Sequence, residues 1–253
     1  MAALRYLLNA LIMAAEVAAV AAVAWLGYEH PLIFSGATAL LAFGLGLALE
    51  AARLNNELPF YFENRKPGPI RAVLVPLVGG MEALMKAVLA GVAALFTFSG
   101  TNHDRLFWVA ILFGLTVFAG AAVLRVLSIK LNAVPSRWGF FRLGAPLGLL
   151  FSAGLAVLAA TSIIPSASLP DLGWKIMWDM PAHPTVDQVS ELVFQIKQAF
   201  DEFVVTILAT VVPPDWARAA GIFISVNVLA GFVAAVYAAV IASGVRAAEK
   251  RAL

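Results

Sequence analysis

The sequence contains no cysteine. Disulfide bonds, iron–sulfur clusters and thiolate-bound zinc are therefore excluded. Histidine is almost as scarce, since His30, His103 and His183 are the only three, and all fall between the long apolar stretches. A haem held between membrane helices needs a histidine within a span, and a metal site needs further ligands at metal spacing. We therefore expect no cofactor and no metal.

Motifs typical of catalysis are also missing. The chain has no GxxxxGK[ST] phosphate loop, no GxSxG nucleophile elbow and no HExxH helix. A retinal-type Schiff base would need a lysine in a late span, and Lys86 is the only lysine deep in any apolar stretch. We therefore do not expect an enzyme.

Charge is sparse as well. Charged residues make up 13% of the 253 residues, whereas hydrophobic residues make up 62%. Soluble domains are typically about 45–50% apolar and about 25% charged. This composition indicates a protein whose solvent is the lipid bilayer. The formal net charge is only +2, and we expect the cations to determine membrane topology rather than to bind nucleic acid.

Six long apolar stretches are present, and each exceeds the roughly 20 residues that a helix needs to cross the hydrocarbon core. They predict an all-α integral membrane protein with spans at about 5–28, 31–52, 72–98, 106–129, 142–164 and 217–245. A membrane barrel would instead need segments of about ten residues with alternating polarity. The first stretch is too long for the core of a signal peptide and is interrupted by Glu16, so we expect a retained helix. The whole chain, 1–253, is expected to form one membrane-embedded domain.

Lysine and arginine concentrate in alternate gaps between the stretches. Most of the 17 cations lie before the first span, between spans two and three, between spans four and five, or after the sixth. Cytoplasmic loops are rich in lysine and arginine, so we predict that both termini are cytoplasmic. We expect the bacterial inner membrane, because the chain is compact and carries no Asn-x-Ser/Thr sequon.

The long connection between spans five and six carries a helical signal. Thr185 and Gln188 are spaced as in a capping box, and apolar residues recur at helical spacing through 189–211. If this segment crossed the membrane, Asp201 and Glu202 would lie near mid-bilayer, where one Asp costs roughly 2.5–3.5 kcal/mol. We therefore predict an external amphipathic helix over 185–212 rather than a seventh span.

The connection 54–70 combines aromatic and basic side chains, namely Phe60, Tyr61, Phe62, Arg65 and Lys66. Prolines at positions 59, 67 and 69 limit any helix here to a turn or two. Two interpretations stay open. The loop either lies at the membrane surface or presents a docking surface for a cytoplasmic partner.

Four polar side chains fall within the predicted spans: Glu16, Glu82, Lys86 and Asn227. Glu82 and Lys86 share one helix face because they are four residues apart, and all four side chains could lie at similar depth. Ionisable residues within the membrane are costly and are by default functional candidates. In the structural alternative, Glu82 and Lys86 neutralise each other along one helix, and a protonated Glu16 bonds a neighbour. Glu50 and Arg53 are expected to mark only the cytoplasmic end of span two.

These observations support two functions. The first is a transport component, a permease or channel-like subunit for a small solute or ion, whose path passes the four polar residues. The layout is similar to that of the membrane subunits of polysaccharide-exporting ABC transporters, with six spans, cytoplasmic ends and short external helices before the last span. This likeness covers the layout alone, since no residue motif carries it and the amphipathic helix expected before the first span is absent. The second function is a non-catalytic accessory subunit of a larger membrane complex, or a homo-oligomer, assembled through small-residue packing sites such as the GxxxG match at Gly144 and Gly148.

Overall fold

The computed structural model describes residues 2–61, 69–98, 103–161, 163, 203, 206–213, 216–217 and 227–252. Throughout these residues the regular secondary structure is helical, which confirms the predicted all-α class. The main elements are α1 (Ala2–Glu29), α2 (Pro31–Tyr61), α3 (Pro69–Thr97), α4 (His103–Leu131), α5 (Pro135–Trp138), the π-helix η1 (Gly139–Leu143), α6 (Gly144–Ala160) and α10 (Asn227–Ala252).

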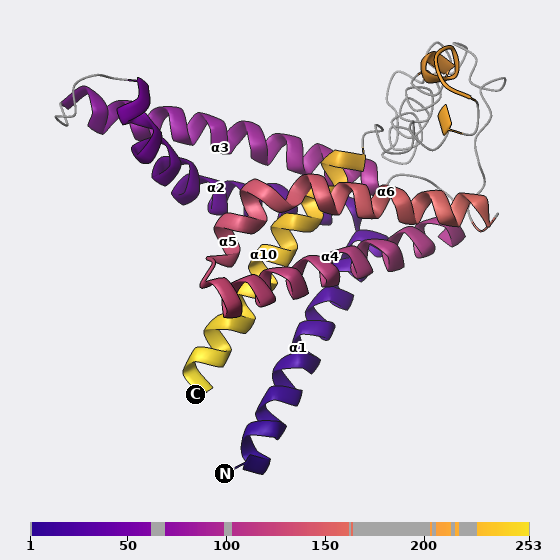
Figure 1. Cartoon of the computed structure of the whole chain (residues 1–253), viewed down its shortest axis with the longest axis horizontal. Helices are drawn as coiled ribbons and strands as arrows, with labels where there is room; N and C mark the ends of the chain where they lie inside the picture. The colour runs from indigo at the N-terminus through magenta and orange to yellow at the C-terminus, as the bar shows by residue number, and fades with distance from the viewer. Residues whose placement is uncertain are drawn as a thin grey trace.

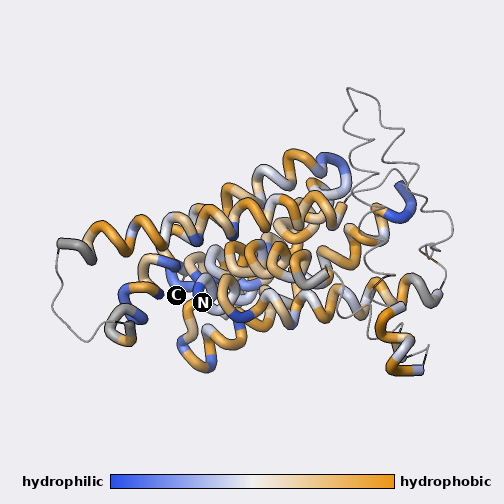
Figure 2. The backbone as a smooth tube through the Cα atoms, turned by 90° about the horizontal axis from the view of Figure 1, so that it is seen from above, coloured by the Kyte–Doolittle hydropathy of each residue, from blue (hydrophilic) through white to orange (hydrophobic). Residues whose placement is uncertain are grey.

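Six helical stretches among the described residues are long and apolar enough to cross a membrane. They are Tyr6–Glu29, Pro31–Glu57, Ala72–Thr97, His103–Leu131, Pro135–Leu158 and Leu229–Arg251. Figure 2 shows hydrophobic residues along most of the length of these helices. The described residues thus contain six helices with the length and composition predicted for spans, and the chain is a multi-pass membrane protein.

The fifth span differs from the prediction of 142–164, because its helix starts at Pro135. Asn132 has a positive φ of 51°, a conformation that ends the preceding α4. Proline suits the first turn of the next helix, where a missing N–H costs no intrahelical bond. From Pro135 the chain runs through α5, η1 and α6 without a break, so that Arg137 and Arg142 lie within the helix rather than before it.

Three other predicted segments differ from the structure or extend beyond the residues that it describes. Helix α2 continues through Pro59 to Tyr61, about two turns past the predicted end of span two at residue 52. The predicted external helix, 185–212, lies mostly outside the described residues. The sixth span was predicted at 217–245, and its described apolar stretch is Leu229–Arg251.

Helix α10 lies at the centre of the structure, where it contacts α6, α4, α3 and α1 (Figure 1). In its most apolar 18 residues 61% are buried, compared with 17–22% in the corresponding parts of α1, α2 and α3. Helices α2 and α3 pack along each other as an extended pair. In Figure 1 both termini and the joined ends of α4 and α5 lie toward the left, whereas the C-terminal end of α6 lies toward the right.

The apolar core is an aromatic cluster around Phe34 of α2. Its ring stacks on Tyr237 of α10, with centroids 5.3 Å apart, and meets Phe98 and Phe113 edge-on at 5.0 and 5.7 Å. The Tyr237 hydroxyl hydrogen-bonds Thr38 at 3.0 Å, so that the buried phenol is satisfied. These contacts join α2, α4 and α10.

The crossing of α6 and α10 depends on glycine. A Cβ added to Gly231 would lie only 2.1 Å from the backbone nitrogen of Gly148 and 2.3 Å from the carbonyl oxygen of Gly144. The GxxxG match therefore has a structural role as the close approach of two helices within the chain.

Replacing Gly231 with valine should separate α6 from α10, because the clashing atoms are backbone and cannot rotate away. We expect a loss of about 3 kcal/mol or more in the free energy of unfolding, as for severe overpacking. Thermal unfolding in detergent measures this loss. Gly36→Ala is the matched control, since no atom lies within 4 Å of a Cβ added there, and a wild-type melting curve for Gly231→Val would contradict the prediction.

Candidate functional site

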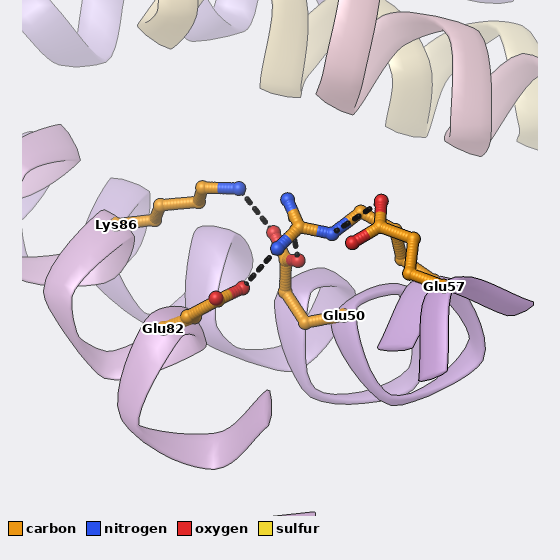
Figure 3. Close-up of polar contacts among 5 residues, drawn as sticks. Glu50, Glu57, Glu82 and Lys86 are labelled. Carbon is orange, nitrogen blue, oxygen red and sulfur yellow. Dashed lines mark hydrogen bonds and ion pairs between the residues drawn. The ribbon is translucent and has the colours of Figure 1, made fainter. Parts of the chain in front are cut away.

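Five charged side chains form an ion-pair network between α2 and α3, which we call the α2–α3 network. Its members are Glu50, Arg53 and Glu57 on α2 and Glu82 and Lys86 on α3. Residues three, four or seven apart lie on one face of a helix, so each helix presents its charged residues as a single stripe. Figure 3 shows Glu82 and Lys86 pointing across from α3 toward Glu50.

The ion pairs of this network run between the two helices. Lys86 Nζ donates to Glu50 Oε1, and Arg53 Nη2 donates to Glu82 Oε2 at 2.5 Å. Arg53 also lies 3.2 Å from Glu50 and 3.4 Å from Glu57 along α2. The structural alternative was that Glu82 and Lys86 neutralise each other along α3. This arrangement is not observed, because each of the two residues pairs with a residue of α2.

Glu50 is the centre of this network. Its side chain is fully buried, whereas those of Arg53, Glu82 and Lys86 are each about one third exposed. The expectation that Glu50 and Arg53 only mark a helix end is wrong, since both form ion pairs that hold α2 to α3. The charged stripe formed by Glu50, Arg53 and Glu57 is visible in the sequence. It resembles the charged end of an ordinary helix, so the contacts with α3 were not predicted from it.

Two aromatic rings from η1 cover the cations of the network. Lys86 Nζ lies 5.3 Å from the ring centroid of Phe140 and 5.2 Å from that of Phe141, and Arg53 Cζ lies 5.9 Å from Phe141. A cation within about 6 Å of an aromatic face is attracted by the ring quadrupole. The rings reach this position because Gly139 allows η1 to pack closely against α10. A Cβ at position 139 would lie only 2.5 Å from Ala239 Cβ.

The charges of the α2–α3 network do not balance. Three carboxylates face one guanidinium and one ammonium, so in their ordinary ionisation states the five side chains carry one net negative charge. The third carboxylate, Glu57, is 43% exposed near the end of α2. The other four members balance, with two carboxylates against two cations.

A second ion-pair network joins α1, α4 and α10. Arg125 Nη1 lies 3.3 Å from Glu16 Oε2 and its Nη2 lies 2.5 Å from Glu249 Oε1. Arg246 lies 3.5 Å from the other oxygen of Glu249. Two carboxylates meet two guanidinium groups, so this network is balanced, and it locks three helices together.

The predicted intramembrane residues are thus divided between the two networks. Glu82 and Lys86 lie together, whereas Glu16 belongs to the second network, and the ion pairs of the described residues do not connect the two. Asn227 is the first residue of α10, and its side chain lies outside the described residues. Neither Arg125 nor Glu249 was among the residues predicted for a site, so the second network was not predicted from the sequence.

The predicted docking loop is described only in part. Phe60 lies in the last turn of α2 with 88% of its surface exposed, and Tyr61 ends that helix. Phe62, Arg65 and Lys66 lie outside the described residues. The choice between a membrane-surface loop and a docking surface therefore stays a prediction.

Comparisons of the chain with protein-family models, with curated proteins and with solved structures find no match. Function is therefore inferred from the two networks. The α2–α3 network differs from the second one in two respects: its side chains, apart from Glu50, are more exposed, and aromatic rings cover its cations.

Proposed function

We propose that this protein is a membrane transport component, a permease or channel-like subunit for a small solute or ion, and that the α2–α3 network is its binding or coupling site. The observation that carries the proposal is that the fully buried carboxylate of Glu50 holds a cation, Lys86, beside two aromatic rings.

Partial exposure is the second support. Arg53, Glu82 and Lys86 lead from the surface of the helix pair to the fully buried Glu50. A charged group that exchanges a ligand needs both a buried partner and an approach from outside, and this arrangement offers both. From the distribution of lysine and arginine we place both termini and the connection 54–70 on the cytoplasmic side of a bacterial inner membrane. Reporter tags on the two termini that read opposite faces would contradict this.

Proteoliposomes test the proposal. We expect the wild-type chain to carry a monovalent cation or proton flux, and Glu50→Gln to reduce this flux by at least about tenfold, because the substitution removes the buried charge that attracts a cation. Glu249→Gln is the matched control, since it changes the same chemistry in the second network and should leave the flux of correctly folded protein within about twofold of wild type. Equal flux in Glu50→Gln and wild type would contradict the proposal.

The alternative, an accessory subunit of a larger membrane complex, is favoured by the low burial of α1, α2 and α3. Large apolar side chains are exposed along α1 and α3, among them Leu7, Leu11, Leu77 and Met81. These faces are suited to lipid or to other subunits. If the reconstituted chain carries no flux and is recovered in mild detergent only with partner subunits, the accessory function replaces the transport function.

A further inference from the structure

The ammonium group of Lys86 lies in surroundings that are suited to any small primary amine. Glu50 accepts a hydrogen bond from it, and the rings of Phe140 and Phe141 lie 5.3 and 5.2 Å from its nitrogen. A buried carboxylate combined with aromatic faces is a common way of recognising an ammonium group. We call these three side chains the ammonium cradle.

The cradle has capacity for more positive charge than it holds. Glu50 Oε2 is buried and accepts no hydrogen bond from the described residues, although Arg53 Nη1 lies 3.2 Å away. This buried oxygen would stabilise an added cation close to Glu50.

Lys86 itself is able to leave the cradle. Its ammonium stands on a flexible four-carbon stem, and its side chain is about one third exposed. Rotation about the stem would carry the charge outward along the exposed side of α3 and would leave Glu50, Phe140 and Phe141 in place. The rings are held independently, since Phe140 packs edge-on against Phe232 of α10 at 5.5 Å.

We propose that the ammonium cradle is the binding site for a small solute that bears a primary ammonium group, and that Lys86 is a tethered occupant which this solute displaces. The proposal rests on the transport function above and names the chemical class of its substrate. The incoming ammonium replaces Lys86 in the ion pair with Glu50, while the Lys86 ammonium moves to the exposed side of α3. A quaternary ammonium lacks the N–H donors that Glu50 requires and should bind poorly.

Chemical complementation tests the cradle directly. Lys86→Ala removes three carbons and the nitrogen, which are the atoms of n-propylammonium. We expect the purified Lys86→Ala protein to melt at a lower temperature than wild type, and n-propylammonium to restore its melting temperature in a saturable manner. Potassium at the same ionic strength and 1-propanol should not do so. If the folded variant responds equally to all three, the proposal is overturned.

Matched variants assign the effect to the cradle. Lys86→Met also removes the charge but fills the space of the stem, so n-propylammonium should not stabilise it. Adding Glu50→Gln to Lys86→Ala should weaken the binding of n-propylammonium by at least about tenfold, since one charge-assisted hydrogen bond is lost. Adding Phe141→Leu should weaken it about fivefold, as expected for one cation–π contact. Unchanged binding in both double variants would also overturn the proposal.

The wild-type protein provides a second measurement that needs no substitution. Methylammonium should stabilise the wild-type protein, but it must displace Lys86 to do so. We therefore expect its half-saturation concentration to be at least about tenfold above that of n-propylammonium with Lys86→Ala. If Lys86→Ala does not fold, a wild-type protein with no preference for methylammonium over potassium overturns the proposal. If methylammonium binds but shows no flux in proteoliposomes, the cradle is supported and the transport function is contradicted. If another cation shows Glu50-dependent flux but no ammonium compound binds, the transport function is supported and the cradle is overturned.

Discussion

Replacing Arg125 with methionine should lower the free energy of unfolding by about 3–5 kcal/mol, the range measured when one partner of a buried ion pair is removed. Arg125 is the one residue of the second network that touches both Glu16 and Glu249. Its loss would leave the carboxylate of Glu16, which is 5% exposed, without its cation inside the bundle. Methionine keeps much of the volume of the arginine stem, so the effect reports the charge rather than a cavity.

Thermal and denaturant unfolding in detergent measure this effect. Arg137→Met is the matched control, because Arg137 is exposed on α5 and its replacement should change stability by no more than about 0.5 kcal/mol. The triple variant Arg125→Met with Glu16→Gln and Glu249→Gln should recover most of the loss, since neutral amides tolerate the absence of a cation. A triple variant that is no more stable than Arg125→Met alone would show that packing, and not charge, causes the loss.

Reversing the charge at Lys86 should also be strongly destabilising. Lys86→Glu places a new carboxylate beside the buried Glu50, and we expect a loss of about 2–3 kcal/mol, reduced from the value for a buried pair because Lys86 is one third exposed. Exchanging the two residues, with Glu50→Lys and Lys86→Glu together, should restore at least half of this loss. The pair crosses from α2 to α3, so restoration reports the interhelical contact itself.

A double-mutant cycle makes this measurement quantitative. The single variants, the exchanged pair and the wild type are compared by the same unfolding assay, and the coupling energy is obtained from their differences. Lys130→Glu, near the end of α4, is the control for reversing a lysine that lies outside both networks. A coupling energy near zero would mean that Lys86 and Glu50 do not stabilise each other.

The number and order of the spans could be predicted from the sequence because both depend on local chemistry. An apolar stretch of sufficient length dictates a helix in lipid wherever it occurs, and Pro31–Glu57 or His103–Leu131 needs no partner to be recognised. The start of the fifth span could not be predicted in this way. The span was predicted to start at residue 142, whereas the helix starts at Pro135.

The partners of the charged residues could not be predicted, because they depend on which helix faces lie together. Glu82 and Lys86 were identified as neighbours on one face, but their ion pairs are with Arg53 and Glu50 on another helix. Glu16 finds its partner at Arg125, 109 residues later in the chain. Residue spacing does not reveal contacts between distant helices. The single polar path through Glu16, Glu82, Lys86 and Asn227 was predicted only from their similar expected depth in the membrane.

That separation along the chain has a consequence for biogenesis. Helix α1 leaves the ribosome with Glu16 uncompensated, and its counter-charge emerges only with the second half of α4. Until then we expect the translocon to shelter the acidic helix, while α2 and α3 enter as a hairpin with its own ion pairs. A nascent chain arrested before Arg125 should therefore crosslink through α1 to the translocon, and one arrested well beyond it should not.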